Sequence, residues 1–240
     1  MKSFKQTSLF AAAAFFTFAC GQPTETVETS EAQEVAEAEG QTLTIQPEAT
    51  MIAWRGYKPT GQHFGKIPAT EGTLVVEGNT LAGGTFTFDI TGLKIEDMEE
   101  TDDSYGKLWG HLQSADFFDA ENYPTATFEI TGVEPFTGDD QIQDVEQFAT
   151  ENTPLAASEL SPEAPTHWIS GNLTMRGTTK NIKFPAAVSL ENGKVMAKAG
   201  FNIDRTAWGL SYQDESATAD KVKDRFIYNT VSLQLEVAAD

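Results

Sequence analysis

Apolar and polar residues alternate one by one in several segments of this chain, and this pattern restricts its fold more than any other feature. Residues 85–90, 125–131 and 231–237 all follow it. Because successive side chains of a strand point to opposite faces, each segment is expected to be a strand with one apolar face. Turn-forming pairs such as Asn192-Gly193 separate the strands. The sequence therefore predicts an all-β domain of antiparallel strands, either a sandwich or a closed barrel.

The amino terminus has the layout of a bacterial secretion signal. Lys2 and Lys5 precede an apolar run over residues 9–18, which is too short for a bilayer span of about 20 residues. We therefore expect residues 1–19 to be a signal peptide that is removed. Cys20, the only cysteine, follows Ala19 in a setting that resembles a lipobox, so acylation is expected. The alternative is a secreted protein whose single thiol is incidental.

Residues 20–42 are expected to form an acidic tether after the acylated cysteine. From residue 21 to residue 40 the chain carries glutamates but no basic and no aromatic residue. Such a segment buries too little apolar surface to offset its ordering entropy, so disorder is predicted, with a marginal acidic helix as the alternative. Removal of the signal would change the net charge from −20 to −22. That charge repels nucleic acid, so attachment to a membrane would rest on the acyl chains.

Several motifs in colinear order resemble those of the YceI-like lipid and polyisoprenoid-binding family. They are Trp54, Gly56, Lys58 and Pro59 with Gly61, His63 and Gly65; Gly83-Gly84-Thr85-Phe86-Thr87-Phe88-Asp89; His111 to Asp119 with Glu121 to Ile130; Ser170 to Lys180; and Asn202 to Leu210. The resemblance runs from about Leu43 to Val237, so residues 43–240 are assigned to one domain, and it implies an eight-stranded, lipocalin-like antiparallel barrel. It also implies a non-enzymatic carrier of a polyisoprenoid, a quinone or a fatty-acyl derivative. As a lipoprotein, the chain would be periplasmic or anchored to the outer membrane of a Gram-negative bacterium.

Two segments depart from the strand pattern. In residues 103–114, apolar side chains recur at three- and four-residue spacing, which predicts a short helix over one end of the barrel. Residues 138–166 form an acidic insertion that is longer than the family's usual link. The spacing of Ile142, Val145 and Phe148 predicts a helix over residues 139–160, as a surface decoration.

The expected ligand site has an apolar lining and a polar mouth. The lining is Trp54, Phe86, Phe88, Leu108, Trp109, Phe117, Phe128, Leu173, Met175, Phe184, Phe201 and Trp208, whose rings either line a tunnel or fill a plain core. The mouth is Lys58, His63, His111, Arg176, Lys180 and Arg205, cations that suit a phosphate head. In the alternative, Arg205 pairs with Asp89, while Arg176 and Lys180 flank a hairpin turn.

Other chemistry finds little support in the sequence. The three histidines lack metal-ligand spacing, so neither a metal site nor a cofactor other than the lipid is expected. Asp116 and Asp119 are interpreted as turn residues, although His111 with Asp116 would be the acid and base of a rival enzyme hypothesis. A second rival is a tethered β-sandwich that binds glycan or protein through Tyr57, Tyr105 and Tyr212. A homodimer is possible, but no motif defines its interface.

Overall fold

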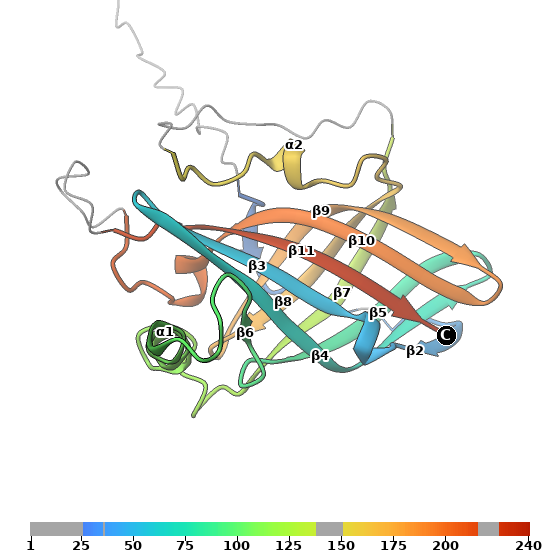
Figure 1. The fold of residues 1–240 in the computed structure, drawn as a ribbon. Helices are drawn as coiled ribbons and strands as arrows, with labels where there is room; N and C mark the ends of the chain where they lie inside the picture. The colour runs from blue at the N-terminus through green and yellow to red at the C-terminus, as the bar shows by residue number, and fades with distance from the viewer. Residues whose placement is uncertain (1–25, 36, 138–150, 216–225) are drawn as a thin grey trace, which may run out of the picture.

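The computed structural model describes residues 26–35, 37–137, 151–215 and 226–240, and its centre is a closed antiparallel barrel (Figure 1). Eight strands form the ring, each bonded to the next and the last to the first. In ring order they are β3 (Met51–Lys58), β4 (Gly61–Glu77), β5 (Thr80–Asp89), β7 (Thr125–Pro135), β8 (His167–Met175), β9 (Thr178–Glu191), β10 (Lys194–Asp204) and β11 (Thr230–Ala239). The predicted barrel is thereby confirmed, and the sandwich alternative is wrong.

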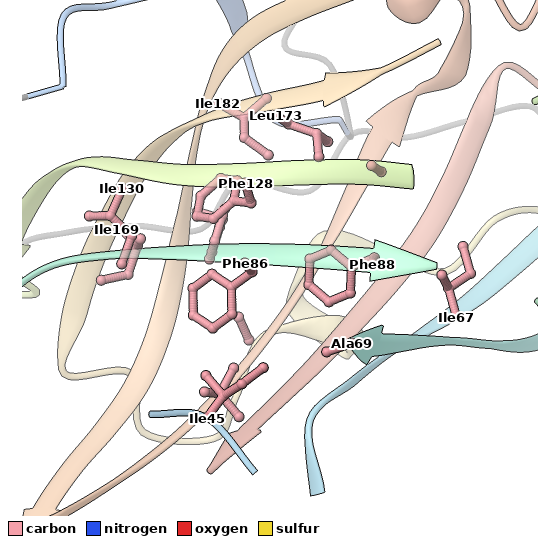
Figure 2. Close-up of a cluster of buried hydrophobic side chains, with 14 of the residues drawn as sticks. Ile45, Ile67, Ala69, Phe86, Phe88, Phe128, Ile130, Ile169, Leu173 and Ile182 are labelled. Atoms are coloured by element: carbon pink, nitrogen blue, oxygen red, sulfur yellow. The ribbon is translucent and has the colours of Figure 1, made fainter. Parts of the chain in front are cut away.

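Aromatic side chains on the inner faces form the centre of the core. The Phe86 ring lies 6.2 Å from that of Phe88 and 6.4 Å from that of Phe128, between neighbouring strands β5 and β7 (Figure 2). Across the barrel, Phe184 and Phe201 stack with ring centroids 4.2 Å apart. Burial of each such ring stabilises the fold by about 1.5–3 kcal/mol. The alternation seen in the sequence thus sends one side chain of every two into this core.

The predicted helix over one end of the barrel is confirmed as α1 (Asp103–Gln113) (Figure 1). It begins where the Asp102 carboxylate accepts a hydrogen bond from the Ser104 amide over 2.7 Å, an N-cap that satisfies one free donor. A short strand, β6 (Lys94–Ile95), pairs with β4 and leads into it. In the described part of the chain, no helix is long and apolar enough to cross a bilayer.

The predicted helix over residues 139–160 is wrong for most of its described part. Residues 138–150 lie outside the described residues, and beyond them only α2 (Ala157–Leu160) is helical. This segment lies on the outer face of the barrel, where the Asn202 amide donates to the Leu155 carbonyl over 2.7 Å. A Cβ on Gly200 would come within 1.9 Å of the Leu160 carbonyl oxygen, so the glycine permits this close approach. The Leu155 and Leu160 contacts, rather than helical propensity, position the segment.

The prediction of a disordered tether is wrong for residues 26–35, which we call the N-terminal strap. Within it, β1 (Thr29–Glu31) pairs with β9, and the Val27 amide donates to the Asn202 carbonyl of β10 over 2.8 Å. β9 and β10 pair with each other only near their hairpin, so the strap lies between them where they separate. Further along, β2 (Gln41–Thr44) pairs with β4 and precedes the short helix η1 (Pro47–Ala49). Backbone hydrogen bonds to open strand edges order the strap, although it buries little apolar surface.

Candidate binding site

The described residues enclose a series of spaces that begins at the α1 end of the barrel and continues along its interior. An outer space of about 310 Å³, the mouth pocket, is followed by an inner cavity of about 120 Å³. Two deep spaces of about 30 Å³ each come next. Neighbouring spaces share walls: Trp54 and Phe117 border both the mouth pocket and the inner cavity. The spaces therefore lie in a row along the barrel.

Ring side chains separate the spaces from one another. Phe88 and Leu173 border both the inner cavity and the first deep space. Phe86, Phe128 and Phe184 border both deep spaces. The walls of the first deep space are entirely apolar, and the inner cavity adds only Arg205, whose guanidinium is bound to backbone. The interior can therefore accept hydrocarbon and offers a polar ligand group very little.

Gly56 lies at the junction between the mouth pocket and the inner cavity, because it borders both. A Cβ placed on it would have no atom within 4 Å. The missing side chain therefore leaves open the passage that joins the two spaces. The motif around Trp54 contained this glycine, yet nothing in the sequence assigned it to the site.

Most of the residues predicted as apolar lining border these spaces. The members that do so are Trp54, Phe86, Phe88, Leu108, Phe117, Phe128, Leu173, Met175, Phe184 and Phe201. Trp109 and Trp208 do not: their ring nitrogens donate to the carbonyls of Leu93 and Leu173, over 3.0 and 2.9 Å, and both serve packing. Sequence reasoning missed Ile52 and Leu233, which the alternation on β3 and β11 would have revealed as inward-facing. Contact with a ligand stays a prediction for all of them.

Three of the predicted mouth cations, Lys58, His63 and His111, border the mouth pocket. The His63 ring nitrogen Nδ1 lies 2.8 Å from a carboxylate oxygen of Asp97, and His111 Nε2 lies 3.1 Å from Asp116. Lys58 is exposed and has no ion-pair partner among the described residues. Because each histidine faces a carboxylate, the mouth has little excess positive charge for a phosphate. His111 and Asp116, the rival acid and base, are thus in contact, with Asp116 more than half exposed.

Arg205 is buried and holds loops together. Its guanidinium donates to the carbonyls of Leu210, Tyr212, Ile227 and Tyr228. The expected alternative, an ion pair with Asp89, is wrong, because the Asp89 carboxylate accepts from Thr91 instead. Burial lowers the pKa of Arg205 from its ordinary value, and nearby carboxylates, Asp214 first among them, oppose that shift. The group orders the segment beside the mouth and has few donors left for a ligand.

Arg176 and Lys180 also make contacts within the protein. Arg176 donates to the carbonyls of Gly209 and Ala115 over 2.6 and 2.7 Å, which ties two loops together at the α1 end. Lys180 pairs with Glu31 of the strap over 2.7 Å, and this contact lowers the pKa of Glu31. Neither residue borders the spaces described above.

The tyrosines of the rival interaction surface do not form one patch. Tyr57 is only 2% exposed, and its hydroxyl lies 2.8 Å from that of Ser232 in the barrel wall. Tyr212 packs edge-on against His111 at the mouth, with ring centroids 4.6 Å apart. Asp119, interpreted as a turn residue, accepts from the Asn122 side chain over 2.9 Å, as a turn requires.

The sequence profile of the YceI-like domain matches residues 43–239. Solved structures that share the barrel include the following two. BcnA of Burkholderia cenocepacia is 15% identical, with a TM-score of 0.51 over 82% of this chain and 99% of its own. A domain from Saccharophagus degradans, described as polyisoprenoid-binding and implicated in plant cell wall breakdown, is 12% identical, with a TM-score of 0.52 over 82% and 97%. No curated protein matches the chain.

Proposed function

The chain belongs to the YceI-like domain family, and on that premise we propose that it binds and carries a long apolar lipid inside its barrel. A polyisoprenoid, a quinone and a fatty-acyl derivative all have the required tail. The observation that carries the proposal is the row of apolar spaces that leads inward from an open mouth. The polyisoprenoid-binding description of the Saccharophagus degradans relative supports the same ligand class. No reaction is proposed.

The size of the inner spaces defines how a long chain would be taken up. At about 120 Å³, the inner cavity is smaller than the engineered cavities of about 150 Å³ that hold one benzene ring. A long tail therefore needs the separating rings of Phe86, Phe128 and Phe184 to turn aside. Their lost packing would be offset by burial of the tail, at about 25 cal/mol for each Å² removed from water. In this proposal the aromatic rings fill a plain core while the protein is empty. They line a tunnel only when the ligand enters.

We further propose that the protein acts at the bacterial cell envelope. Residues 1–19 would be removed as a signal and Cys20 acylated, although both lie outside the described residues. Each buried methylene of an acyl chain contributes about 0.8 kcal/mol to membrane attachment, and two or more chains hold a protein stably. The negative net charge of the chain opposes attachment to anionic headgroups, so the acyl chains would supply all of it.

Native mass spectrometry of the full chain, purified from a bacterial envelope and then extracted with organic solvent, tests the lipid-binding proposal. We expect one lipid of defined mass per protein. An empty protein that also refuses added polyprenyl alcohol, quinone and fatty amide would overturn it. In that case the tethered interaction module, which needs no cavity, would become the better hypothesis.

A further inference from the structure

The indole nitrogen of Trp54 lacks a hydrogen-bond partner. Among the described residues, it is the one buried side-chain nitrogen or oxygen in that state. Two other tryptophans show the usual arrangement, because the N–H groups of Trp109 and Trp208 both donate to backbone carbonyls. A buried donor without an acceptor costs free energy in the empty protein, and such groups are rare in folded proteins. The position of Trp54 suggests what would satisfy it.

Trp54 lies where the mouth pocket meets the inner cavity, beside the open position of Gly56. A lipid whose tail fills the inner cavity and whose head lies in the mouth pocket would have its first polar atom at this junction. The Trp54 nitrogen exposes almost no surface in the empty protein, so the indole ring must turn for its N–H to reach that atom. An indole N–H only donates, so it recognises an acceptor such as a carbonyl, ether or hydroxyl oxygen.

The charges around the mouth pocket indicate that this acceptor is neutral. Asp97 faces His63 and Asp116 faces His111, so among the described cations that border the mouth pocket only Lys58 has no carboxylate partner. Neither carboxylate borders the pocket itself, but each offsets the charge of a histidine that does, so a phosphate head would enter a chain of net charge −20 with only Lys58 to attract it. A neutral oxygen head meets no such repulsion.

We propose that Trp54 donates a hydrogen bond to a neutral oxygen on the head of the bound lipid and thereby selects alcohols, amides, esters or quinones over hydrocarbons and phosphates. The inference rests on the proposed lipid binding and adds the chemistry of the head group. Trp54→Phe isolates the hydrogen bond, because it removes the N–H and keeps an aromatic ring.

Equilibrium binding of radiolabelled dodecanol, dodecane and dodecyl phosphate to the full chain tests this. The unaltered protein should bind dodecanol most tightly. Trp54→Phe should weaken dodecanol binding about three- to tenfold, which corresponds to one lost hydrogen bond, and leave dodecane binding unchanged. Equal losses for dodecanol and dodecane, no loss for dodecanol, or preference for dodecyl phosphate would each overturn the inference while leaving lipid binding intact. A protein that binds none of the three overturns both.

Thermal unfolding of the empty protein supplies a second readout. Loss of the N–H in Trp54→Phe should not itself lower the melting temperature, because this donor has no hydrogen-bond partner in the empty protein. Trp109→Phe is the matched control: it should lower the melting temperature, since it removes the hydrogen bond to the Leu93 carbonyl, and it should keep the ratio of dodecanol to dodecane affinity. A change of that ratio in Trp109→Phe alone would overturn the assignment to Trp54.

Discussion

Asn172 hydrogen-bonds both backbone polar groups of Gln33: the Gln33 amide donates to Oδ1 over 3.0 Å, and Nδ2 donates to the Gln33 carbonyl over 2.7 Å. The Asn172 side chain lies on the outside of β8. It bonds the backbone of the strap through one donor and one acceptor, as the backbone of a neighbouring strand would. Asn181 donates to the same oxygen over 3.1 Å and fixes its orientation. Asn172 is only 5% exposed, so these bonds are shielded from water.

Asn172→Ala should release the N-terminal strap. Loss of the two bonds to Gln33 and the one from Asn181 is expected to cost about 1–3 kcal/mol. Hydrogen exchange followed by mass spectrometry should show faster exchange in residues 26–35 and unchanged protection in β5 and β7. Asn79→Ala, in an exposed turn, is the control. Unaltered exchange in the strap of Asn172→Ala would contradict this role.

The Glu31–Lys180 contact predicts acid sensitivity of the strap. The hydrogen bond and the charge of Lys180 lower the pKa of Glu31, so the folded protein favours ionised Glu31 more than the unfolded chain does. The stabilisation is therefore present above the ordinary glutamate pKa of about 4.3 and is lost as the pH falls through the lower folded value.

Melting temperatures of the unaltered protein and Glu31→Gln measure this effect. The two curves should differ near neutral pH and converge as the pH falls through the lowered pKa of Glu31. Glu28→Gln removes the same charge from the strap without touching Lys180, and its difference should not depend on pH in this way. If the two melting temperatures differ by the same amount at every pH, ionised Glu31 contributes no pH-dependent stability, and the prediction is wrong.

Gly56→Leu should block the passage between the mouth pocket and the inner cavity. The added side chain enters open space, so the melting temperature should change little, while dodecanol affinity should fall on the order of tenfold or more. Gly106→Leu, on α1 and also facing open space, is the matched control and should bind normally. Normal binding by Gly56→Leu would mean that lipid reaches the interior by another route.

Arg205→Lys should destabilise the protein although it keeps the charge. A lysine ammonium cannot reach four separate carbonyls as the guanidinium does, so the cost is expected to be about 3 kcal/mol. Denaturant unfolding measures it, with Arg55→Lys as a partly exposed control. If Arg205→Lys keeps its stability but binds lipid more weakly, Arg205 contacts the ligand, as the sequence predicted.

The parts of the fold that follow from local patterns were predictable. The alternation in β5 and β7 and the spacing in α1 are properties of neighbouring residues, and both are confirmed. The lining residues could be named as a class, because inward phenylalanines share the same strand phase. The closed barrel and the position of its mouth were predicted only from the family resemblance. The alternation of apolar and polar residues fits a sandwich equally well.

The features that were missed depend on contacts that no periodic pattern in the sequence marks. Arg205 binds carbonyls that follow it in an irregular segment, and no periodic signal marks such a contact. The glutamates of the strap predict a disordered tether, yet backbone groups of β9 and β10 order it. Gly56 contributes to the site through the absence of a side chain, which the sequence reveals only once the neighbouring walls are known.

The strap extends the folded structure beyond the residues that match the family. The family match begins at residue 43, but residues 26–35 cover the seam between β9 and β10. A recombinant polypeptide begun at the family boundary would expose both strand edges, and bare edges of this kind invite pairing between molecules. Expression of this protein should therefore start upstream of Thr26, because aggregation of a shorter polypeptide would reflect the missing strap and not the barrel itself.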